Sequence, residues 1–90
     1  MTFQVTVKNE NGELVNDVWV VVNDLITGQM FSRTTNAGYA DCATFPPSAV
    51  GNRVTIVVTD PFLRYTGLTH GDMYEITDHN QTVEVTLKPF

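Results

Sequence analysis

The feature that most constrains this chain is an alternation of apolar and polar residues with a period of two. Phe3, Val5 and Val7 alternate with polar residues near the start of the chain, and residues 53–59 and 81–87 repeat the pattern. Successive side chains of a β-strand point to opposite faces, so this alternation is typical of strands that are buried on one face. Apolar residues do not recur at helical spacing in any segment, and we therefore expect very little helix.

Residues that favour turns separate the alternating segments at roughly 8–12-residue spacing, as in β-sandwiches. Asn11-Gly12 tolerates the positive φ angles of a tight hairpin, and neither residue of Pro46-Pro47 can donate a hydrogen bond to a ladder. The pattern predicts an all-β fold, an antiparallel sandwich of two sheets with about seven strands. We expect one domain over residues 1–90, because a chain this short cannot support a second core.

Two segments differ from the simple alternation. Residues 17–23 are apolar on both faces and rich in β-branched side chains, which predicts a central strand covered on each side. Residues 60–80 show no sustained alternation, and a passage of this kind in a small domain is usually functional or hides a short element. Residues 73–77 are the best candidate for a hidden strand. The first and last strands carry no proline or charge cluster, so either could pair with another chain at a sheet edge.

Charge and cysteine content exclude several classes of protein. Five basic and ten acidic residues give a formal net charge of −5, which repels phosphate backbones and anionic membrane surfaces. We therefore expect neither nucleic acid nor membrane as a partner. The first residues lack the basic start and apolar run of a signal peptide, which predicts synthesis without one. Cys42 is the only cysteine, so no intrachain disulfide can form and stability must come from packing.

Catalytic chemistry finds little support in the sequence. Only His70 and His79 could act as an imidazole base, and the Gly-x-Ser-x-Gly motif is missing. We predict no enzyme activity, no catalytic residue and no cofactor. Asp72, Glu75 and Asp78 lie near both histidines and could converge with them on a cation. Acidic residues also crowd any solvated turn and the spacing matches no known metal-binding loop, so we predict a solvated face without a metal.

Trp19 and Val21 point to the opposite face of their strand from Val18, Val20 and Val22. If one set builds the core, the other needs a separate cover, because leaving it in water forgoes roughly 2–4 kcal/mol. A subunit or partner could cover this face, since exposed apolar patches usually mark interfaces. Alternatively, the 60–80 segment folds over it. The apolar side chains available for that cover are Phe62, Leu63, Tyr65, Leu68, Tyr74 and Ile76.

A series of small strand and turn motifs follows a familiar order along the chain. They are Val5 to Val7, Asn11-Gly12, Val18 to Asp24, Thr27-Gly28, Thr34 to Ala40, Phe45-Pro46-Pro47 and Val54 to Val58. Over about residues 3–59 the chain resembles the carboxypeptidase regulatory-like domains, which share a prealbumin-like sandwich with transthyretin. The resemblance implies an Ig-like or prealbumin-like sandwich used as a non-catalytic module, often in secreted, cell-surface or virion proteins. Transthyretin-like hydrolases end in Tyr-Arg-Gly-Ser, whereas this chain ends in Leu87-Lys88-Pro89-Phe90, so the resemblance does not extend to that enzymatic branch.

These features together predict a structural or accessory protein of a larger assembly that acts through protein-protein contacts with a partner or with its own copies. An acidic sandwich of the extracellular type, without signal peptide or disulfide and complete at 90 residues, suits a virion component such as a capsid decoration, fibre or tail protein. We expect it in a virion or outside the cell. The residues expected to make the contacts are Phe62, Leu63, Arg64, Tyr65, Tyr74 and Phe90.

A carbohydrate- or cell-surface-binding module is the alternative function. Flat aromatic side chains stack on sugar rings in carbohydrate-binding sandwiches, and Trp19, Tyr39, Tyr65 and Tyr74 could serve in this way. Two or three of them would have to lie in one plane on an exposed face.

Overall fold

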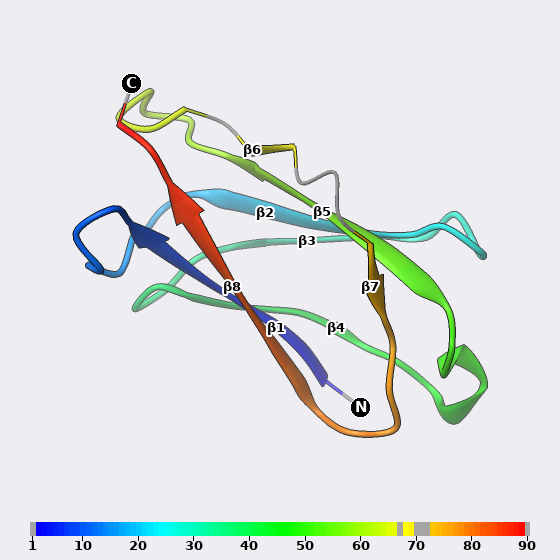
Figure 1. Cartoon of the computed structure of the whole chain (residues 1–90). Helices are drawn as coiled ribbons and strands as arrows, with labels where there is room; N and C mark the ends of the chain where they lie inside the picture. The colour runs from blue at the N-terminus through cyan, green and yellow to red at the C-terminus, as the bar shows by residue number, and fades with distance from the viewer. Residues whose placement is uncertain (1, 67, 70–72, 90) are drawn as a thin grey trace.

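The alternating segments fold into two β-sheets that pack face to face (Figure 1). The computed structural model describes residues 2–66, 68–69 and 73–89. The smaller sheet has the strand order β4-β1-β8, and the larger sheet has the order β3-β2-β5-β6, with β7 also paired to β5. The strands are β1 (Thr2–Asn9), β2 (Trp19–Asp24), β3 (Met30–Thr34), β4 (Tyr39–Thr44), β5 (Arg53–Thr59), β6 (Leu68–Thr69), β7 (Tyr74–Glu75) and β8 (Gln81–Leu87). The predicted all-β sandwich of two sheets is confirmed.

The strands follow the sequence pattern closely. The hidden strand expected within residues 73–77 is β7, and the two-residue strand β6 was not expected. Helix in the described residues is limited to one 3-10 turn, Pro47–Ala49, which begins where the two prolines end the preceding extended segment. The described residues include no helix long and apolar enough to cross a membrane.

One strand pair departs from the antiparallel arrangement. β1 and β8 run parallel, from Phe3 opposite Gln81 to Asn9 opposite Leu87. The other described strand pairs are antiparallel. β1 is therefore the middle strand of the smaller sheet and has no free edge, so the prediction that the first strand could pair with another chain was wrong. The last strand, β8, does lie at an edge of its sheet.

The inward-facing residues of both sheets form one core. Phe3, Val5 and Val7 of β1 are fully buried, and so are Val20 and Val22 of β2. Burying a side chain of this size is worth about 1.5–3 kcal/mol, so the alternation read in the sequence is also the main force that holds the two sheets together.

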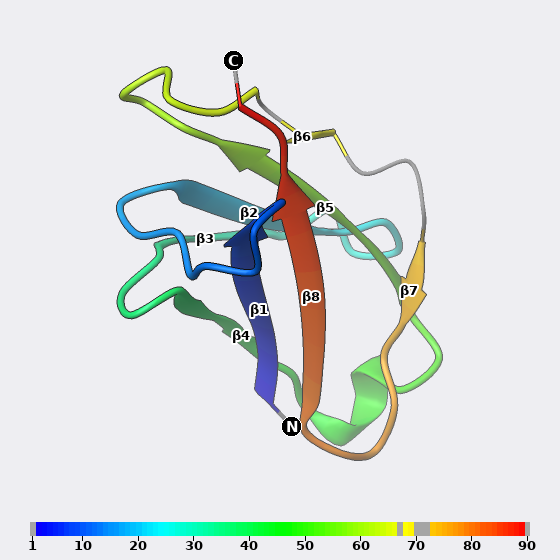
Figure 2. The same cartoon turned by 60° about the vertical axis from the view of Figure 1, so that its left-hand side comes forward.

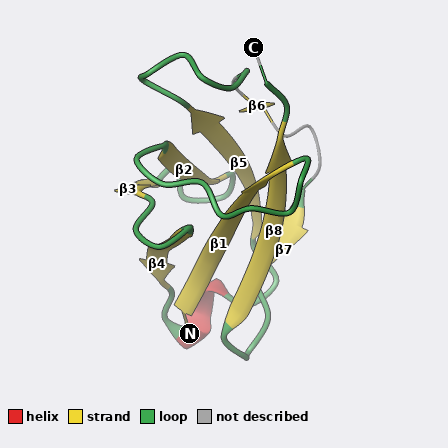
Figure 3. Ribbon diagram, turned by 90° about the vertical axis from the view of Figure 1, so that its left-hand side faces the viewer, coloured by secondary structure: helices red, strands yellow, loops and turns green. Residues whose placement is uncertain are grey.

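Loops close the sandwich at two ends (Figure 2; Figure 3). One end holds the start of β1 and the 3-10 turn, and the other holds the end of β8 and residues 60–66. At this second end, Tyr65 forms an isolated β-bridge with Pro89, and the Thr66 N–H donates to the Lys88 carbonyl at 2.9 Å. The segment after β5 is thus tied to the segment after β8.

Candidate interaction site

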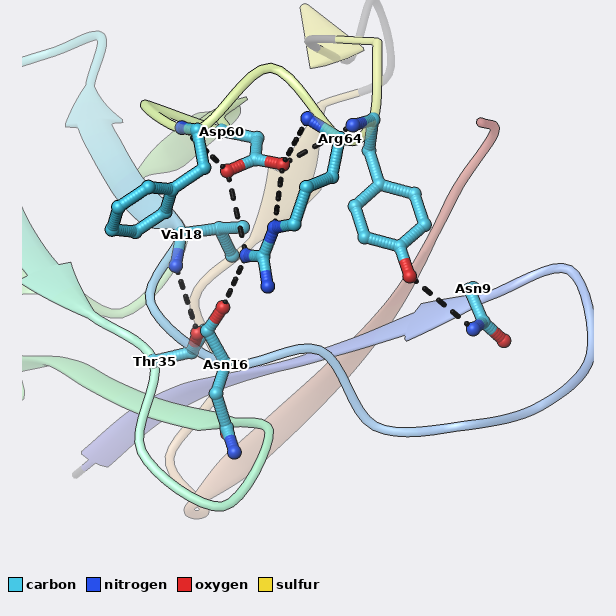
Figure 4. A network of polar contacts seen from close by, with 8 residues as sticks. Asn9, Asn16, Val18, Thr35, Asp60 and Arg64 are labelled. Atoms are coloured by element: carbon cyan, nitrogen blue, oxygen red, sulfur yellow. Dashed lines mark hydrogen bonds and ion pairs between the residues drawn. The ribbon is translucent and has the colours of Figure 1, made fainter. Parts of the chain in front are cut away.

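A buried aspartate organises the loop that follows β5 (Figure 4). The Asp60 side chain is 0% exposed. Its carboxylate accepts hydrogen bonds from the backbone N–H groups of Phe62 (3.0 Å), Arg64 (2.9 Å) and Tyr65 (3.1 Å). A short aspartate side chain can accept from the N–H two residues further on, which is the basis of an Asx turn. Asp60 therefore fixes the backbone of residues 60–65, which we call the Asp60 loop.

Arg64 completes this arrangement. Its Nε and Nη2 atoms lie 3.2 and 3.4 Å from the Asp60 carboxylate oxygens, and Nη2 also donates to the Asn16 carbonyl at 2.8 Å. The guanidinium carbon is 5.3 Å from the ring centroid of Phe62 and 5.7 Å from that of Tyr65, within range of a cation-π contact. Arg64 was expected to contact a partner, and the structure shows that it braces its own loop.

The neighbouring loops at this end of the sandwich are tied together as well. The Gly38 N–H donates to the Asn16 side-chain oxygen at 2.6 Å, and the Val18 N–H donates to the buried Thr35 hydroxyl at 3.2 Å. The Asp60 loop therefore rests on a hydrogen-bonded platform built from the segments before β2 and before β4.

The environment of Asp60 also sets its protonation. Burial of the carboxylate acts to raise its pKa, but the hydrogen bonds from Arg64 and from backbone N–H groups outweigh burial, so the pKa of Asp60 lies below its ordinary value of 3.8. The side chain is ionised at neutral pH, and the network keeps its charge-assisted hydrogen bonds.

A second buried aspartate, Asp24, organises the turn between β2 and β3. Its carboxylate accepts from the N–H groups of Ile26 (2.9 Å) and Thr27 (3.2 Å) and from the Asn52 side-chain amide (3.3 Å). Burial again acts to raise the pKa, and the hydrogen bonds lower it below 3.8. The turns that end β2 and β5 are thus built in the same way, at opposite ends of two antiparallel neighbours.

Two apolar side chains stand out from the Asp60 loop. Phe62 is 65% exposed and Leu63 is 68% exposed. Leu63 has a φ of 57°, in the left-handed region, which costs a residue other than glycine roughly 1–2 kcal/mol. Such strain persists only where surrounding contacts over-determine the backbone, and it concentrates at functional sites. The loop is held in a strained shape that places two apolar side chains in water.

The other residues expected to contact a partner lie elsewhere. Tyr65 packs against the core, and its hydroxyl oxygen accepts from the Asn9 side-chain amide at 3.4 Å. Tyr74 is half-buried and also packs against the core. Phe90 lies outside the described residues. The structure therefore brings Phe62 and Leu63 together as exposed groups, with Arg64 and Tyr65 in supporting positions beside them.

The outer face of the larger sheet is a second candidate surface. The strand register sets Val21 of β2 between Ser32 of β3 and Val57 of β5, and Trp19 between Thr34 and Thr59. Trp19 is 60% exposed and Met30 is 71% exposed. Trp19, Val21, Met30 and Ser32 line an open hollow of about 280 Å³.

The side chains described between residues 60 and 80 do not form the internal cover predicted for this face, and the Leu68 side chain lies outside those described. Ile76 is 1% exposed within the core, and Tyr65 and Tyr74 pack against the core from its margin. Phe62 and Leu63 remain exposed. That prediction was wrong for these residues, because Ile76 enters the core and Trp19 stays 60% exposed.

The outer face of the smaller sheet is different in character. Lys8 and Glu84 form an ion pair there, with 3.3 Å between Nζ and Oε2. The Thr82 hydroxyl lies 3.4 Å from the Gln4 side-chain oxygen. This is an ordinary solvated sheet face, so the apolar outer face of the larger sheet is a specific property of that sheet.

The possible metal-binding residues fall partly outside the described ranges, which contain neither His70 nor Asp72. The His79 side chain is 84% exposed and the Asp78 side chain is 74% exposed. His79 Nε2 lies 3.3 Å from Asp78 Oδ1. Within the described residues, no group of three or more metal-binding side chains gathers.

The aromatic side chains that could stack on sugars do not share a face. Tyr65 and Tyr74 pack against the core. Tyr39 lies on β4 of the smaller sheet, whereas Trp19 lies on β2 of the larger sheet. A flat platform of two or three aromatic rings is therefore not formed by these four residues.

Comparison with known proteins adds no relative. No model of a protein family matches the chain, and no curated protein is similar to it. The resemblance to carboxypeptidase regulatory-like domains stays a prediction.

Sequence reasoning missed the two buried aspartates that shape the turns. The available signal was their position, because each directly follows an apolar strand and precedes a turn, as in Asp24 to Gly28 and Asp60-Pro61.

Proposed function

We propose that this chain is a non-catalytic structural or accessory module of a larger assembly, and that it joins the assembly through protein-protein contacts of the Asp60 loop. The observation that carries the proposal is the exposure of Phe62 and Leu63 on a backbone fixed by the Asp60 carboxylate. A fixed loop loses little conformational entropy when it binds, so more of the contact energy is kept as affinity.

The chemistry of the loop limits the partner. Phe62 and Leu63 require an apolar recess, and burial of one such side chain is worth about 1.5–3 kcal/mol. The formal net charge of −5 favours a partner surface that is neutral or basic around that recess. An acidic partner surface would repel this chain and slow the association. A protein surface provides both features.

A virus particle is the proposed setting, with the chain as a capsid decoration, fibre or tail component. Support comes from the cysteine content: with Cys42 alone, the fold cannot depend on an intrachain disulfide. Such a sandwich can fold in a reducing cytoplasm and persist after release to an oxidising exterior.

The test is sedimentation of the tagged chain through a density gradient, after expression in the cells that produce it. The chain should migrate with a large particle, and the double change Phe62→Ser with Leu63→Ser should move it to the free fraction at the top of the gradient. The matched control is Val50→Ser with Met73→Ser, which removes two other exposed apolar side chains (46% and 53% exposed) and should leave migration unchanged. A wild-type chain found only in the free fraction would contradict the proposal, as would equal behaviour of the two double variants.

A further inference from the structure

Exposed apolar side chains are found on the larger sheet and on the turns at its two ends. Ten large apolar residues are exposed among those described, and six of them belong to β2, β3 or the turns that end β2 and β5. These six are Trp19, Leu25, Ile26, Met30, Phe62 and Leu63. Trp19 and Met30 lie on the outer face itself, whereas Leu25 with Ile26 and Phe62 with Leu63 stand on turns at its opposite ends.

The outer face formed by β2, β3 and β5 also carries little charge. Alternation and register place three residues of β2, three of β3 and four of β5 on it. They are Trp19, Val21, Asn23, Met30, Ser32, Thr34, Arg53, Thr55, Val57 and Thr59. Arg53, at one end of the face, is the single charged residue among these ten, and the register places the exposed Glu75 of β7 directly beside it. No carboxylate lies among the ten, although the chain carries ten acidic residues.

We propose that the outer face of the larger sheet is a self-association face, on which a second copy of this chain packs in a two-fold dimer. Two copies that each carry a formal charge of −5 repel one another. They meet at low electrostatic cost where carboxylates are few. The ten outer positions of β2, β3 and β5 carry none, and Glu75 of β7 lies at one end of the face, beside the opposite charge of Arg53.

The shape of the face is self-complementary. In a two-fold interface the same patch serves both copies, so a protruding group needs a recess within the same patch. The Trp19 indole is 60% exposed and stands beside the hollow of about 280 Å³ that it lines with Val21, Met30 and Ser32. Each copy therefore offers one aromatic group and one apolar recess, and the Met30 thioether provides a favourable contact for an entering ring.

The size of the face corresponds to a small interface. β2, β3 and β5 contain six, five and seven residues, a strand rises about 3.3 Å per residue, and neighbouring strands lie about 4.8 Å apart. These strands thus present a flat area of roughly 300 Å² per copy, below the roughly 800 Å² per partner of a standard interface. The face therefore fits a weak dimer that forms as concentration rises.

Packing through the face is favoured over pairing through the edge strand β3. Arg33 lies opposite Val20, whose side chain is fully buried, so Arg33 is on the core-facing side of the sheet at its margin. A charged residue in this position is a known device that protects an edge strand from pairing with another chain. The outer face carries no comparable protection.

The test is sedimentation velocity of the purified chain over a concentration series, with reducing agent present so that Cys42 cannot cross-link copies. The wild-type chain should shift from 10.0 kDa towards twice that mass as concentration rises. Trp19→Thr removes the protruding ring and keeps a residue that favours strands. Ser32→Glu places a carboxylate at the recess of both copies. Each variant should weaken dimerisation at least tenfold.

The matched control is Thr82→Glu, which adds a carboxylate to the exposed outer face of the smaller sheet and should leave the dimer unchanged. A wild-type chain that stays at 10.0 kDa up to its highest soluble concentration would overturn the proposal. So would a dimer that survives both Trp19→Thr and Ser32→Glu, or one that the control disrupts equally.

The gradient experiment separates this inference from the proposed function. If copies remain monomers and Trp19→Thr releases the chain from a particle, the face binds a different protein and self-association is wrong. If the dimer forms but no particle is bound, the self-association face stands and the proposed function fails.

Discussion

Replacing Asp60 with Asn tests whether the buried carboxylate holds the Asp60 loop. Oδ2 accepts from the N–H groups of Arg64 and Tyr65 and from the Arg64 Nε, while Oδ1 accepts from the Phe62 N–H and the Arg64 Nη2. Asn supplies one oxygen and must place an NH₂ group at the other position, where it faces donors. At least one backbone N–H then loses its acceptor, and every remaining bond loses its charge assistance.

The expected cost follows from these losses. Hydrogen bonds to a charged group contribute about 1.5–3 kcal/mol each, and breaking a buried pair costs about 3–5 kcal/mol. The Arg64 side chain is 44% exposed and can regain water, so we expect Asp60→Asn to lower the free energy of unfolding by about 2–4 kcal/mol. For a domain of this size, about 3 kcal/mol lowers Tm by roughly 12–24 °C.

The assay is chemical and thermal unfolding at pH 7, followed by circular dichroism. Asp78→Asn is the matched control, because the Asp78 side chain is 74% exposed, and it should change stability by less than about 0.5 kcal/mol. If Asp60→Asn stayed within that same small range, the carboxylate would not organise the loop and the argument from its hydrogen bonds would be refuted.

Three further predictions concern these two turns and the turn before β4. The folded-state pKa of both buried aspartates lies below the ordinary value of 3.8. Their stabilisation is therefore complete above that value and is lost as pH falls through the folded pKa. The denaturation midpoint of the wild-type chain should decline as pH falls below about 5, and that of Asp60→Asn should decline less steeply. Gly38→Ala should cost about 2–4 kcal/mol, because its Cβ would lie 2.6 Å from the Leu14 Cβ at a φ of +82°. Gly28→Ala, at +75° with no atom within 4 Å, should cost only about 1 kcal/mol, and equal denaturation midpoints would contradict the steric argument. Leu63→Gly should leave stability unchanged or raise it by up to about 1 kcal/mol, because glycine removes the left-handed strain; a clear loss of Tm would show that the Leu63 side chain supports the fold.

Much of the sandwich could be read from side-chain alternation. Val20 and Val22 fill the core while Trp19 and Val21 point outward, as the opposite faces of one strand require. The alternation did not show which strands are neighbours in each sheet. Alternation is the same whichever way a strand runs, so the parallel pairing of β1 with β8 could not be read from it.

The candidate site could be read less fully. The exposed apolar residues of the 60–80 segment were identified, but not which of them enter the core. Ile76 is buried and Phe62 is not, although both are apolar residues in one irregular segment. Phe62 lies in the turn that the Asp60 carboxylate fixes. The Ile76 N–H donates to the Asn52 carbonyl, and the Ile76 carbonyl accepts from the Gly51 N–H. Both arrangements depend on contacts that only the folded backbone provides.

The parallel pairing of the first and last strands has a mechanical consequence. Thr2 begins β1 at one end of the sandwich and Leu87 ends β8 at the other. A tensile load applied between these points is directed along the two adjacent strands, in shear. The ladder from Phe3–Gln81 to Asn9–Leu87 must then slip as a unit, since all of its hydrogen bonds share the force at once, whereas a hairpin pulled from its open end unzips one bond at a time. This geometry makes the molecule a stiff link in any structure that is stretched through its termini.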